Sequence, residues 1–388
     1  MNFKKLITVI LVLATVAALL TACTGRLPKE AFDADGRFDY FNSDMTRYIA
    51  IDKKDYTGTT VKIQKMLDGS DEGVMAYIDM LREENASSTG KKIVDRAVVN
   101  GDTVALYYEG WLNGEKFSGG SNMDDASPYS LKIGSGTFIP GFEEALIGLV
   151  PNQTSRDNMV DIPLTFPSDY HSAEMAGKSV IFKVYIEYID EIAPAEYTEE
   201  FITKTLKYTT TDKDVKASFE KYIKDEVIPS VRDNEILSQI WESLFDDAVV
   251  KSYPETEITH YYDQYVAQYK SYQSYYAQYG ITFNTLDEFV IAYLGLESGA
   301  DWKAETRAQC EIDVQQTLIY HYIAQVENIT ITDADYQESI TYYVNYYADY
   351  KYTAAQIESE LGSRFLKEHA LFENVQDYLI ENCNVIYE

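Results

Sequence analysis

Apolar and polar residues alternate in two stretches of the chain. Residues 102–108 (DTVALYY) and 180–189 (VIFKVYIEYI) place β-branched or aromatic residues at every second position. Successive side chains of a strand point to opposite faces, so this period of two predicts half-buried β-strands. Asn113-Gly114 follows the first stretch and is typical of a tight hairpin turn. We therefore expect a sheet within residues 91–191.

Helical spacing appears once inside this region and then dominates from residue 197 onward. Phe142, Leu146 and Leu149 have the spacing of one short helix. Residues 215–250 form one long amphipathic stretch, which Pro229 is expected to kink or break. The second half of the chain is therefore predicted to be helical.

Two further signals mark helix ends in the second half. Pro254 suits the first turn of a helix, because the amide hydrogen that proline lacks would have no partner there. Residues 332–335 (TDAD) resemble a capping box with Asp335 in place of the usual Glu. A helix is also expected over residues 301–326.

The first ninety residues read differently. Lys4 and Lys5 precede an uncharged run over residues 6–20, too short to span a bilayer comfortably and typical of a signal peptide. The following Leu-Thr-Ala-Cys23 resembles a bacterial lipobox, which implies removal of residues 1–22 and diacylation of Cys23. An uncleaved anchor is the alternative, and either places the protein at the cell membrane on its extracytoplasmic face. Residues 23–90 are turn-rich and are expected to form a tether or linker, with one short helix near residues 73–81.

Charge and composition exclude several functions. The chain has 388 residues and a formal charge of −30, which opposes binding to nucleic acid. Its four histidines and three cysteines are scattered, so we expect no metal site and no cofactor. Cys310 and Cys383 are far apart in sequence, and the sequence leaves open whether they pair.

Four ordered motifs lie between residues 114 and 184. They are G-x-x-F-x-G-G at 114–120, I-G-S-G-x-F-I-P-G-F-E at 133–143, F-P-x-D-Y-H at 166–171 and A-G-K-x-x-x-F-x-V at 176–184. This order resembles the FKBP-type peptidyl-prolyl cis–trans isomerase domain, in the version found in trigger factor. The match covers about a hundred residues in unbroken order, whereas F-I-P-G-F-E alone would be weak.

The resemblance implies a site that twists an X–Pro bond without a nucleophile. Such a site needs a dry, shaped pocket, because a twisted amide is less dipolar than a planar one. The family's catalytic pocket falls on Tyr108, Phe117, Phe138, Ile139, Phe142 and Phe182. Its further substrate-binding positions fall on Tyr129, Tyr170 and His171.

The resemblance also implies a role for each position. Tyr108 offers a hydroxyl, and the Ile139 N–H holds the substrate carbonyl. Phe142 forms the floor, while Phe117 and Phe182 flank the proline ring. Taken singly, aromatic residues at strand spacing are more often core residues than pocket residues. Phe182 is the residue for which these two roles are hardest to distinguish from sequence.

This sequence departs from many stand-alone family members at two positions. Ser118 stands where an Asp is common, and Phe142 where a Trp is common. Both departures are typical of the trigger-factor branch. They leave open how well the site catalyses.

The helical half also resembles trigger factor, in its C-terminal domain. The implied fold class is α+β: an FKBP-like antiparallel sheet wrapped on a short helix, then an all-α domain. We expect a signal peptide over residues 1–22, a tether over 23–90, an isomerase domain over 91–191 and a helical chaperone domain over 192–388. We find no basic ribosome-binding loop, and a ribosome partner is not expected.

The helical half is unusually rich in tyrosine, of which the chain has 34. At spacings of three or four residues these side chains share one helix face, which suits adaptable binding of unfolded segments. They are Tyr261, Tyr262, Tyr265, Tyr269, Tyr272, Tyr276 and Tyr279, then Tyr342, Tyr343, Tyr346, Tyr347 and Tyr350. The alternatives are a bundle core or a choice that favours solubility.

The leading hypothesis is a lipid-anchored isomerase and chaperone for unfolded or nascent secreted proteins. One alternative is a chaperone that holds clients with weak or no isomerase activity. The other is a non-catalytic surface lipoprotein with one specific partner. A solute-binding lipoprotein fits poorly, because no alternating βαβ pattern is present.

Overall fold

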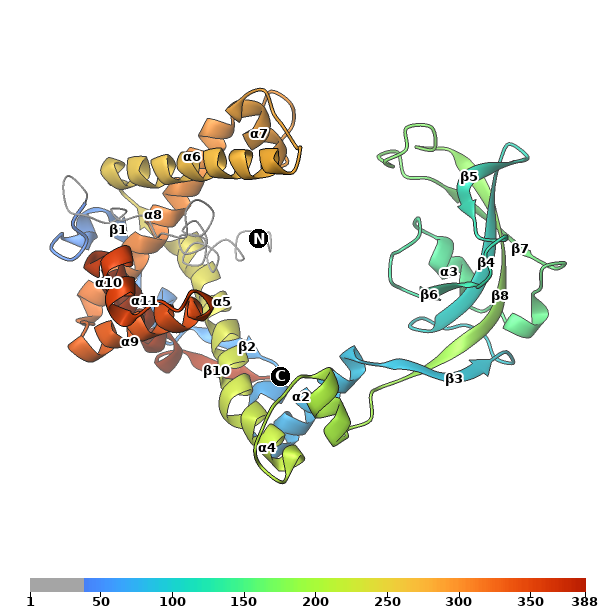
Figure 1. Cartoon of the computed structure of the whole chain (residues 1–388), viewed down its shortest axis with the longest axis horizontal. Helices are drawn as coiled ribbons and strands as arrows, with labels where there is room; N and C mark the ends of the chain where they lie inside the picture. Colours follow the sequence, from blue (N-terminus) through green and yellow to red (C-terminus); the bar gives the residue numbers. More distant parts are fainter. Residues whose placement is uncertain (1–37) are drawn as a thin grey trace. The chain divides into compact units, whose positions relative to one another are not determined.

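The computed structural model describes residues 38–388, and they form two compact units. One unit, here the sheet unit, covers residues 69–225. The other, here the helical unit, combines residues 38–68 with residues 226–388 (Figure 1). The signal-peptide and Cys23 predictions lie outside the described residues. Within residues 38–388, no helix combines the length and apolar character needed to span a membrane.

The sheet unit is built on one antiparallel sheet of six strands. Its central strands β8 and β4 pair along most of their length, β3 and β7 pair with β8, and β5 and β6 pair with β4 (Figure 1). The strands are β3 (Ser87–Ile93), β4 (Thr103–Leu112), β5 (Glu115–Ser121), β6 (Tyr129–Lys132), β7 (Val160–Thr165) and β8 (Ser179–Ala193).

One face of this sheet packs on the short helix α3 (Phe142–Leu146). Val104 and Leu106 of β4 and Val180 and Val184 of β8 are buried in that core, at alternate positions along each strand. The period of two in the sequence is therefore confirmed as one buried and one outer face. We call the second face, which points away from α3, the outer face.

The predicted hairpin turn is present between β4 and β5. Asn113 and Gly114 both have positive φ, at 54° and 87°. Two successive left-handed residues define the type of turn whose twist matches the paired strands. Leu112 accordingly pairs with Glu115 across the turn.

Helix α2 (Asp71–Glu84) and helix α4 (Val215–Tyr222) complete the sheet unit, the first of them at the predicted short helix. The long stretch over residues 215–250 is interrupted as expected near Pro229. A π-helical turn, η6 (Ile223–Val227), separates α4 from α5 (Ile228–Asp247), and Pro229 lies in the first turn of α5. Proline removes one backbone hydrogen bond from a helix, and this helix is irregular at the turn directly before Pro229.

The helical unit consists mainly of α5 and six further helices. The predicted capping box is confirmed at the start of α9, where the Thr332 N–H donates to Asp335 at 2.7 Å. Pro254 directly precedes α6. The helices are α6 (Glu255–Gln278), α7 (Leu286–Tyr293), α8 (Trp302–Glu327), α9 (Asp333–Tyr346), α10 (Ala354–Leu361) and α11 (Ser363–Glu381).

Residues 38–68 are part of the helical unit and residues 69–90 part of the sheet unit, which corrects the prediction of a tether over the described part of residues 23–90. Residues 192–225 also belong to the sheet unit, so the helical unit resumes at residue 226 and not at the predicted 192. Strand β2 (Thr60–Ile63) pairs in parallel with β10 (Asn384–Tyr387), near the C-terminus. Strand β1 (Ile49–Ala50) pairs with β9 (Val249–Val250). The apolar residues that anchor this segment are fully buried: Met45, Ile49, Tyr56, Val61, Ile63 and Leu67. They lie in short elements whose partners are hundreds of residues away, so local pattern did not reveal them.

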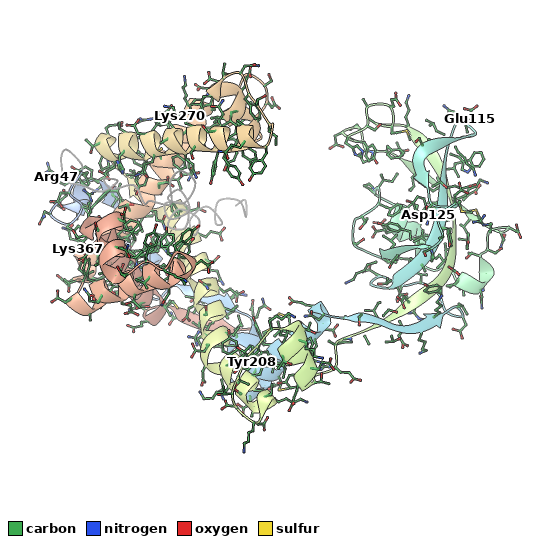
Figure 2. The ribbon with its side chains drawn as sticks, viewed as in Figure 1. Arg47, Glu115, Asp125, Tyr208, Lys270 and Lys367 are labelled. Carbon is green, nitrogen blue, oxygen red and sulfur yellow. The ribbon has the colours of Figure 1, made fainter. Side chains whose placement is uncertain are left out.

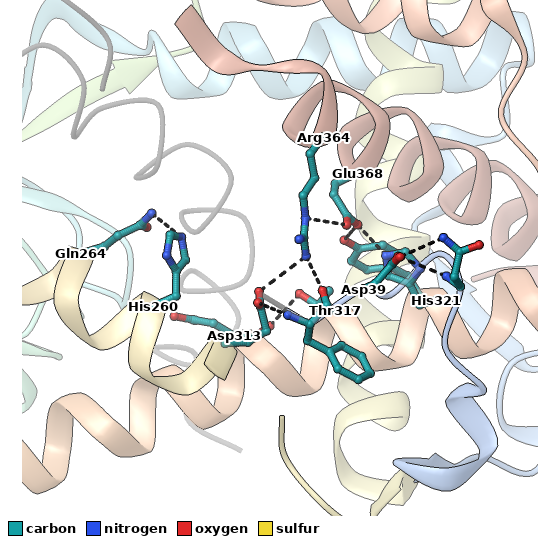
Figure 3. Close-up of polar contacts among 12 residues, drawn as sticks. Asp39, His260, Gln264, Asp313, Thr317, His321, Arg364 and Glu368 are labelled. Atoms are coloured by element: carbon teal, nitrogen blue, oxygen red, sulfur yellow. Dashed lines mark hydrogen bonds and ion pairs between the residues drawn. The ribbon is translucent and has the colours of Figure 1, made fainter. Parts of the chain in front are cut away.

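A buried charged network holds the start of this segment (Figure 3). Arg364 on α11 donates to the Phe38 carbonyl at 2.6 Å and lies 3.8 Å from Glu257. Glu257 accepts the Phe38 N–H at 3.0 Å. Beside them, Glu368 lies 2.5 Å from His321 and accepts the Tyr320 hydroxyl at 2.7 Å. Buried charges persist only where they are paired and hydrogen-bonded, as these are.

The two remaining cysteines are free. Cys310 is buried in α8, and Cys383 is partly buried after α11. Burial raises the pKa of the Cys310 thiol to about 12, which makes it a poor nucleophile.

A second buried carboxylate joins α6 to α8. Asp313 on α8 is 2% exposed, and it accepts hydrogen bonds from Tyr265 at 2.9 Å and Gln309 at 3.0 Å. Burial raises its pKa from 3.8 to about 6, against the smaller effect of these two donors. The folded protein therefore holds a proton that the unfolded chain has already lost near pH 5.

We expect Asp313→Asn to stabilise the protein increasingly as pH rises. The wild type loses stability between about pH 4 and pH 6, because only its unfolded state ionises freely there. The difference in free energy of unfolding should grow by about 2–3 kcal/mol between pH 4 and pH 7. Denaturant titrations at several pH values measure it, with exposed Asp246→Asn as control. A difference independent of pH would contradict this.

Candidate functional site

The predicted pocket residues come together on the core face of the sheet, around α3. Phe142 lies with its ring 5.3 Å from Phe182 on β8 and 6.1 Å from Tyr108 on β4. Phe117 on β5 packs on Phe182 at 5.8 Å. Most of these contacts are edge-to-face, the arrangement that aromatic rings prefer. The rings therefore form one continuous apolar surface.

Phe138 stacks on Phe142 with ring centroids 4.2 Å apart and planes 16° from parallel. Phe142 has no exposed surface, whereas Phe138 and Ile139 are partly buried. The floor position is thus covered by Phe138. Phe182, at 5% exposed, is also a core residue, so the accessible walls are Tyr108, Phe117 and Phe138.

Two glycines fix the ring of Phe117. A methyl group added at Gly110 would lie 2.3 Å from this ring, and one added at Gly120 would lie 2.2 Å from it. No side chain fits at those distances, so the ring is sandwiched between two stretches of bare backbone. This explains the last glycine of the G-x-x-F-x-G-G motif.

The other three predicted positions differ in placement. Tyr129 on β6 packs its ring 5.5 Å from Phe138 and is 37% exposed, so it extends the wall. Tyr170 packs on Phe166, which contacts Phe117 and joins the same surface. His171 is exposed and contacts Tyr170, so it lies at the rim.

A carboxylate that sequence reasoning missed organises the loop carrying Phe138. Glu143 on α3 is 5% exposed. One of its oxygens accepts the N–H groups of Thr137 at 2.8 Å and Phe138 at 3.3 Å, and the other accepts those of Gly134 at 2.7 Å and Gly136 at 3.2 Å. Burial alone would raise the pKa of Glu143, but these hydrogen bonds outweigh it and hold the pKa below its usual value.

A signal for Glu143 was present in the sequence. The glycine-rich loop over residues 133–137 exposes several N–H groups that need an acceptor, and Glu143 follows directly after Phe142. A second missed residue is Asn122, which is 4% exposed. Its amide accepts the Tyr108 N–H at 2.7 Å and donates to the Leu106 carbonyl at 3.1 Å, which fixes β4 beside the pocket.

Two polar groups belong to residues that pack against this apolar cluster. The pKa of Tyr108 is raised, first by burial and then by Tyr129 and Asp125, so its hydroxyl stays protonated and can donate. Asp125 is labelled in Figure 2. Among residues 38–388, none accepts a hydrogen bond from the Ile139 N–H. This leaves one hydroxyl and one amide to orient a substrate carbonyl.

Within residues 38–388, no group of three or more His, Cys, Asp or Glu side chains is arranged to hold a metal ion. The site therefore offers shape, apolar walls and two hydrogen-bond donors.

The twisted sheet on a short helix and its ring-lined surface define an FKBP-type isomerase domain, joined to a helical unit. Comparison with known families agrees: residues 94–187 match the FKBP-type peptidyl-prolyl cis–trans isomerase, and residues 213–381 match the bacterial trigger factor C-terminus.

Individual relatives extend this match over most of the chain. Trigger factor of Caldicellulosiruptor saccharolyticus is 31% identical over 319 residues, covering 82% of this chain and 68% of the relative. Trigger factor of Alkaliphilus oremlandii is 29% identical, covering 87% and 71%. A solved trigger factor chaperone aligns at 16% identity with a TM-score of 0.35, covering 86% and 72%. The chain belongs to the trigger factor family.

We expect Glu143→Gln to loosen the loop that carries Phe138. The amide presents an NH2 group to N–H donors, so at least two hydrogen bonds to a charged acceptor are lost, each of about 1.5–3 kcal/mol. Isomerase kcat/KM should fall at least tenfold, and the amide NMR signals of Gly134 and Gly136 should shift. Glu174→Gln, exposed on a neighbouring loop, is the control. An unchanged loop spectrum would contradict the assigned role.

Proposed function

We propose that this chain is a lipid-anchored, extracytoplasmic peptidyl-prolyl cis–trans isomerase and chaperone that assists the folding of secreted proteins. The observation that carries the proposal is the ring-lined site with its uncommitted Ile139 N–H, on a chain of the trigger factor family. Each part of the proposal has separate support.

The isomerase part rests on the physics of the X–Pro bond. Rotation breaks amide resonance and faces a barrier of roughly 18–20 kcal/mol. An apolar pocket disfavours the planar, more dipolar amide, and a fixed donor holds the carbonyl while the bond turns. Tyr108, Phe117 and Phe138 would supply the walls, and the Ile139 N–H would hold the carbonyl.

The chaperone part rests on the helical unit, where the repeated tyrosines range from buried to mostly exposed. Tyr269, Tyr343 and Tyr347 are at most 5% exposed and belong to the core, so the proposed binding face does not include them. Four others are about half exposed or more: Tyr279, Tyr342, Tyr346 and Tyr350. These four present apolar area with a polar tip, which suits weak binding to many unfolded segments.

The anchoring part rests on sequence alone. Lys4 and Lys5, the short apolar run and Leu-Thr-Ala-Cys23 support a lipoprotein signal. Two acyl chains on Cys23 would give stable attachment. Labelling of cells with a tagged fatty acid decides this part: the wild type should incorporate it and Cys23→Ser should not, whereas no incorporation into the wild type would contradict lipidation.

We expect the full chain to catalyse isomerisation of a short X–Pro peptide. Tyr108→Phe removes only the hydroxyl and should lower kcat/KM about fivefold to tenfold, the effect of one hydrogen bond. Phe138→Ala removes a wall and should lower it further. Phe142→Ala is a poor test, because deleting a fully buried ring costs about 3–5 kcal/mol and tests folding. Tyr185→Phe, on the outer face, is the control. A folded but inactive wild type would leave binding as the pocket's only role.

We expect the exposed tyrosines to carry client binding. Serine at positions 279, 342, 346 and 350 should leave the circular dichroism spectrum unchanged but at least halve the suppression of aggregation of a guanidinium-denatured test protein. Tyr222→Ser, exposed on α4 in the sheet unit, is the control. Full suppression by the fourfold variant would exclude this surface.

One observation favours a second candidate, a chaperone that holds clients with little catalysis. Phe138 lies over Phe142, so a proline ring reaches the floor only if Phe138 moves. A site that must open first binds with reduced affinity and turns over more slowly. The short-peptide assay above distinguishes the two candidates.

A further inference from the structure

The outer face of the sheet carries an apolar row that a solvent-facing sheet normally lacks. Cross-strand pairing places Trp111 of β4 beside Ile181 of β8, and Ile181 beside Pro163 of β7. Pro163 is exposed, Ile181 is 42% exposed and Trp111 is partly exposed. The solvent-facing side of an antiparallel sheet is usually polar, so three adjacent apolar residues need another explanation.

The next row on the outer face is ionic and self-neutralising. It joins Glu109, Lys183 and Asp161 by cross-strand pairing. Lys183 lies 3.4 Å from Asp161, and Lys116 of β5 lies 2.6 Å from Glu109. Two carboxylates meet two ammonium groups, so this region is neutral on a chain of formal charge −30.

These charged groups also fix the indole. Trp111 Nε1 donates to Glu109 at 3.0 Å, and the ammonium groups of Lys116 and Lys183 lie 5.4 and 5.9 Å from the ring centroid. A large side chain held in one orientation loses little entropy when a ligand packs on it.

The row lines a cavity of about 720 Å³, here the outer groove. Its walls include the hairpin turn at Asn113 and Gly114, next to Glu115 in Figure 2, and the strand ends at Thr165 and Ser179. None of the pocket rings around Phe142 lines it. The volume is typical of ligand sites.

The geometry points to a second, non-catalytic site: we propose that the outer groove binds an uncharged, proline-containing segment of an unfolded chain in the polyproline II conformation. This inference rests on the proposed function, because it assigns the client segment a second point of attachment. Its test reads binding and not catalysis.

Spacing supports this ligand. Neighbouring strands lie about 4.8 Å apart, so Trp111 and Pro163, two strands apart, are separated by about 9.5 Å. Residues i and i+3 of a polyproline II helix lie on the same side, about 9.3 Å apart. Two proline rings can thus rest on Trp111 and Pro163 with Ile181 between them. Recognition of such segments by aromatic grooves is a general mode.

Strand addition is the less suitable mode at this edge. Pro163 has no amide hydrogen, so β7 cannot offer a continuous ladder to an incoming strand. A ligand that packs on the side chains of the outer face does not need the missing Pro163 amide hydrogen. The lack of net charge also matches an uncharged ligand.

The three tryptophans make the test specific. Trp241 and Trp302 are 3% and 4% exposed and lie in the helical unit, so Trp111 is the one tryptophan in the groove. We would label the full chain with 5-fluorotryptophan, assign the signals with Trp111→Phe, and titrate with an acetylated, amidated proline nonamer. Only the Trp111 fluorine signal should shift, and saturably.

Substitutions then separate binding from folding. Trp111→Ala and Ile181→Ser should each weaken nonamer binding at least fivefold by calorimetry, with isomerase activity on a short X–Pro peptide unchanged within twofold. Ile192→Ser is the matched control: Ile192 lies on the same strand, is 41% exposed and is outside the groove.

The outcomes are decisive in both directions. A Trp111 shift with weakened binding in both variants supports the groove, even if the chain proves to have no isomerase activity. No shift, or unchanged affinity in Trp111→Ala and Ile181→Ser, overturns it even if the isomerase is active. Equal binding of an uncharged alanine-threonine nonamer overturns the proline specificity.

Discussion

The parallel pairing of β2 with β10 is the constraint on which the architecture depends. It joins residues 60–63 to residues 384–387, and the buried charges around Arg364 hold the segment that leads into it. The helical unit is therefore made from both ends of the described chain, and the sheet unit is an insertion between residues 68 and 226. Arg364, Glu257 and Glu368 stabilise this region only when all three are present, because removing one partner leaves another charge buried and unpaired.

Within the sheet unit, the candidate site is built from apolar groups held in fixed positions and not from nucleophilic side chains. The ring of Phe117 is fixed between Gly110 and Gly120, and the loop before α3 is fixed by the Glu143 carboxylate. The proposed reaction twists one bond and needs no nucleophile, so the placement of these apolar groups matters more than any reactive side chain. Trp111 on the outer face is a second ring held in place: its indole donates to Glu109 and lies beside the ammonium groups of Lys116 and Lys183.

Local pattern predicted the strands, the Asn113-Gly114 turn, the interruption near Pro229 and the capping box at Thr332, because each depends on neighbours in sequence. The family resemblance predicted which rings meet around Phe142. Residues 38–68 escaped prediction because their burial depends on partners such as Glu327 and Gln239, which local periodicity cannot register. The tyrosine repeat was ambiguous for a similar reason. Tyr342 and Tyr343 are neighbours in sequence and lie on adjoining faces of one helix. Only the packing of the folded protein leaves Tyr343 2% exposed and Tyr342 51% exposed.

The β2–β10 pairing also sets an order of events during synthesis. Every strand of the sheet unit lies within residues 87–193, so its sheet can form before residues 226–388 of the helical unit are made. Strand β2 of the helical unit lacks its partner until residues 384–387 are available, whereas β1 can pair with β9 earlier. An emerging copy of this protein therefore holds β2, with its buried Val61 and Ile63, without its strand partner while residues 64–383 are made. A chaperone with this topology depends, for its own folding, on a strand pairing that spans nearly all of the described residues.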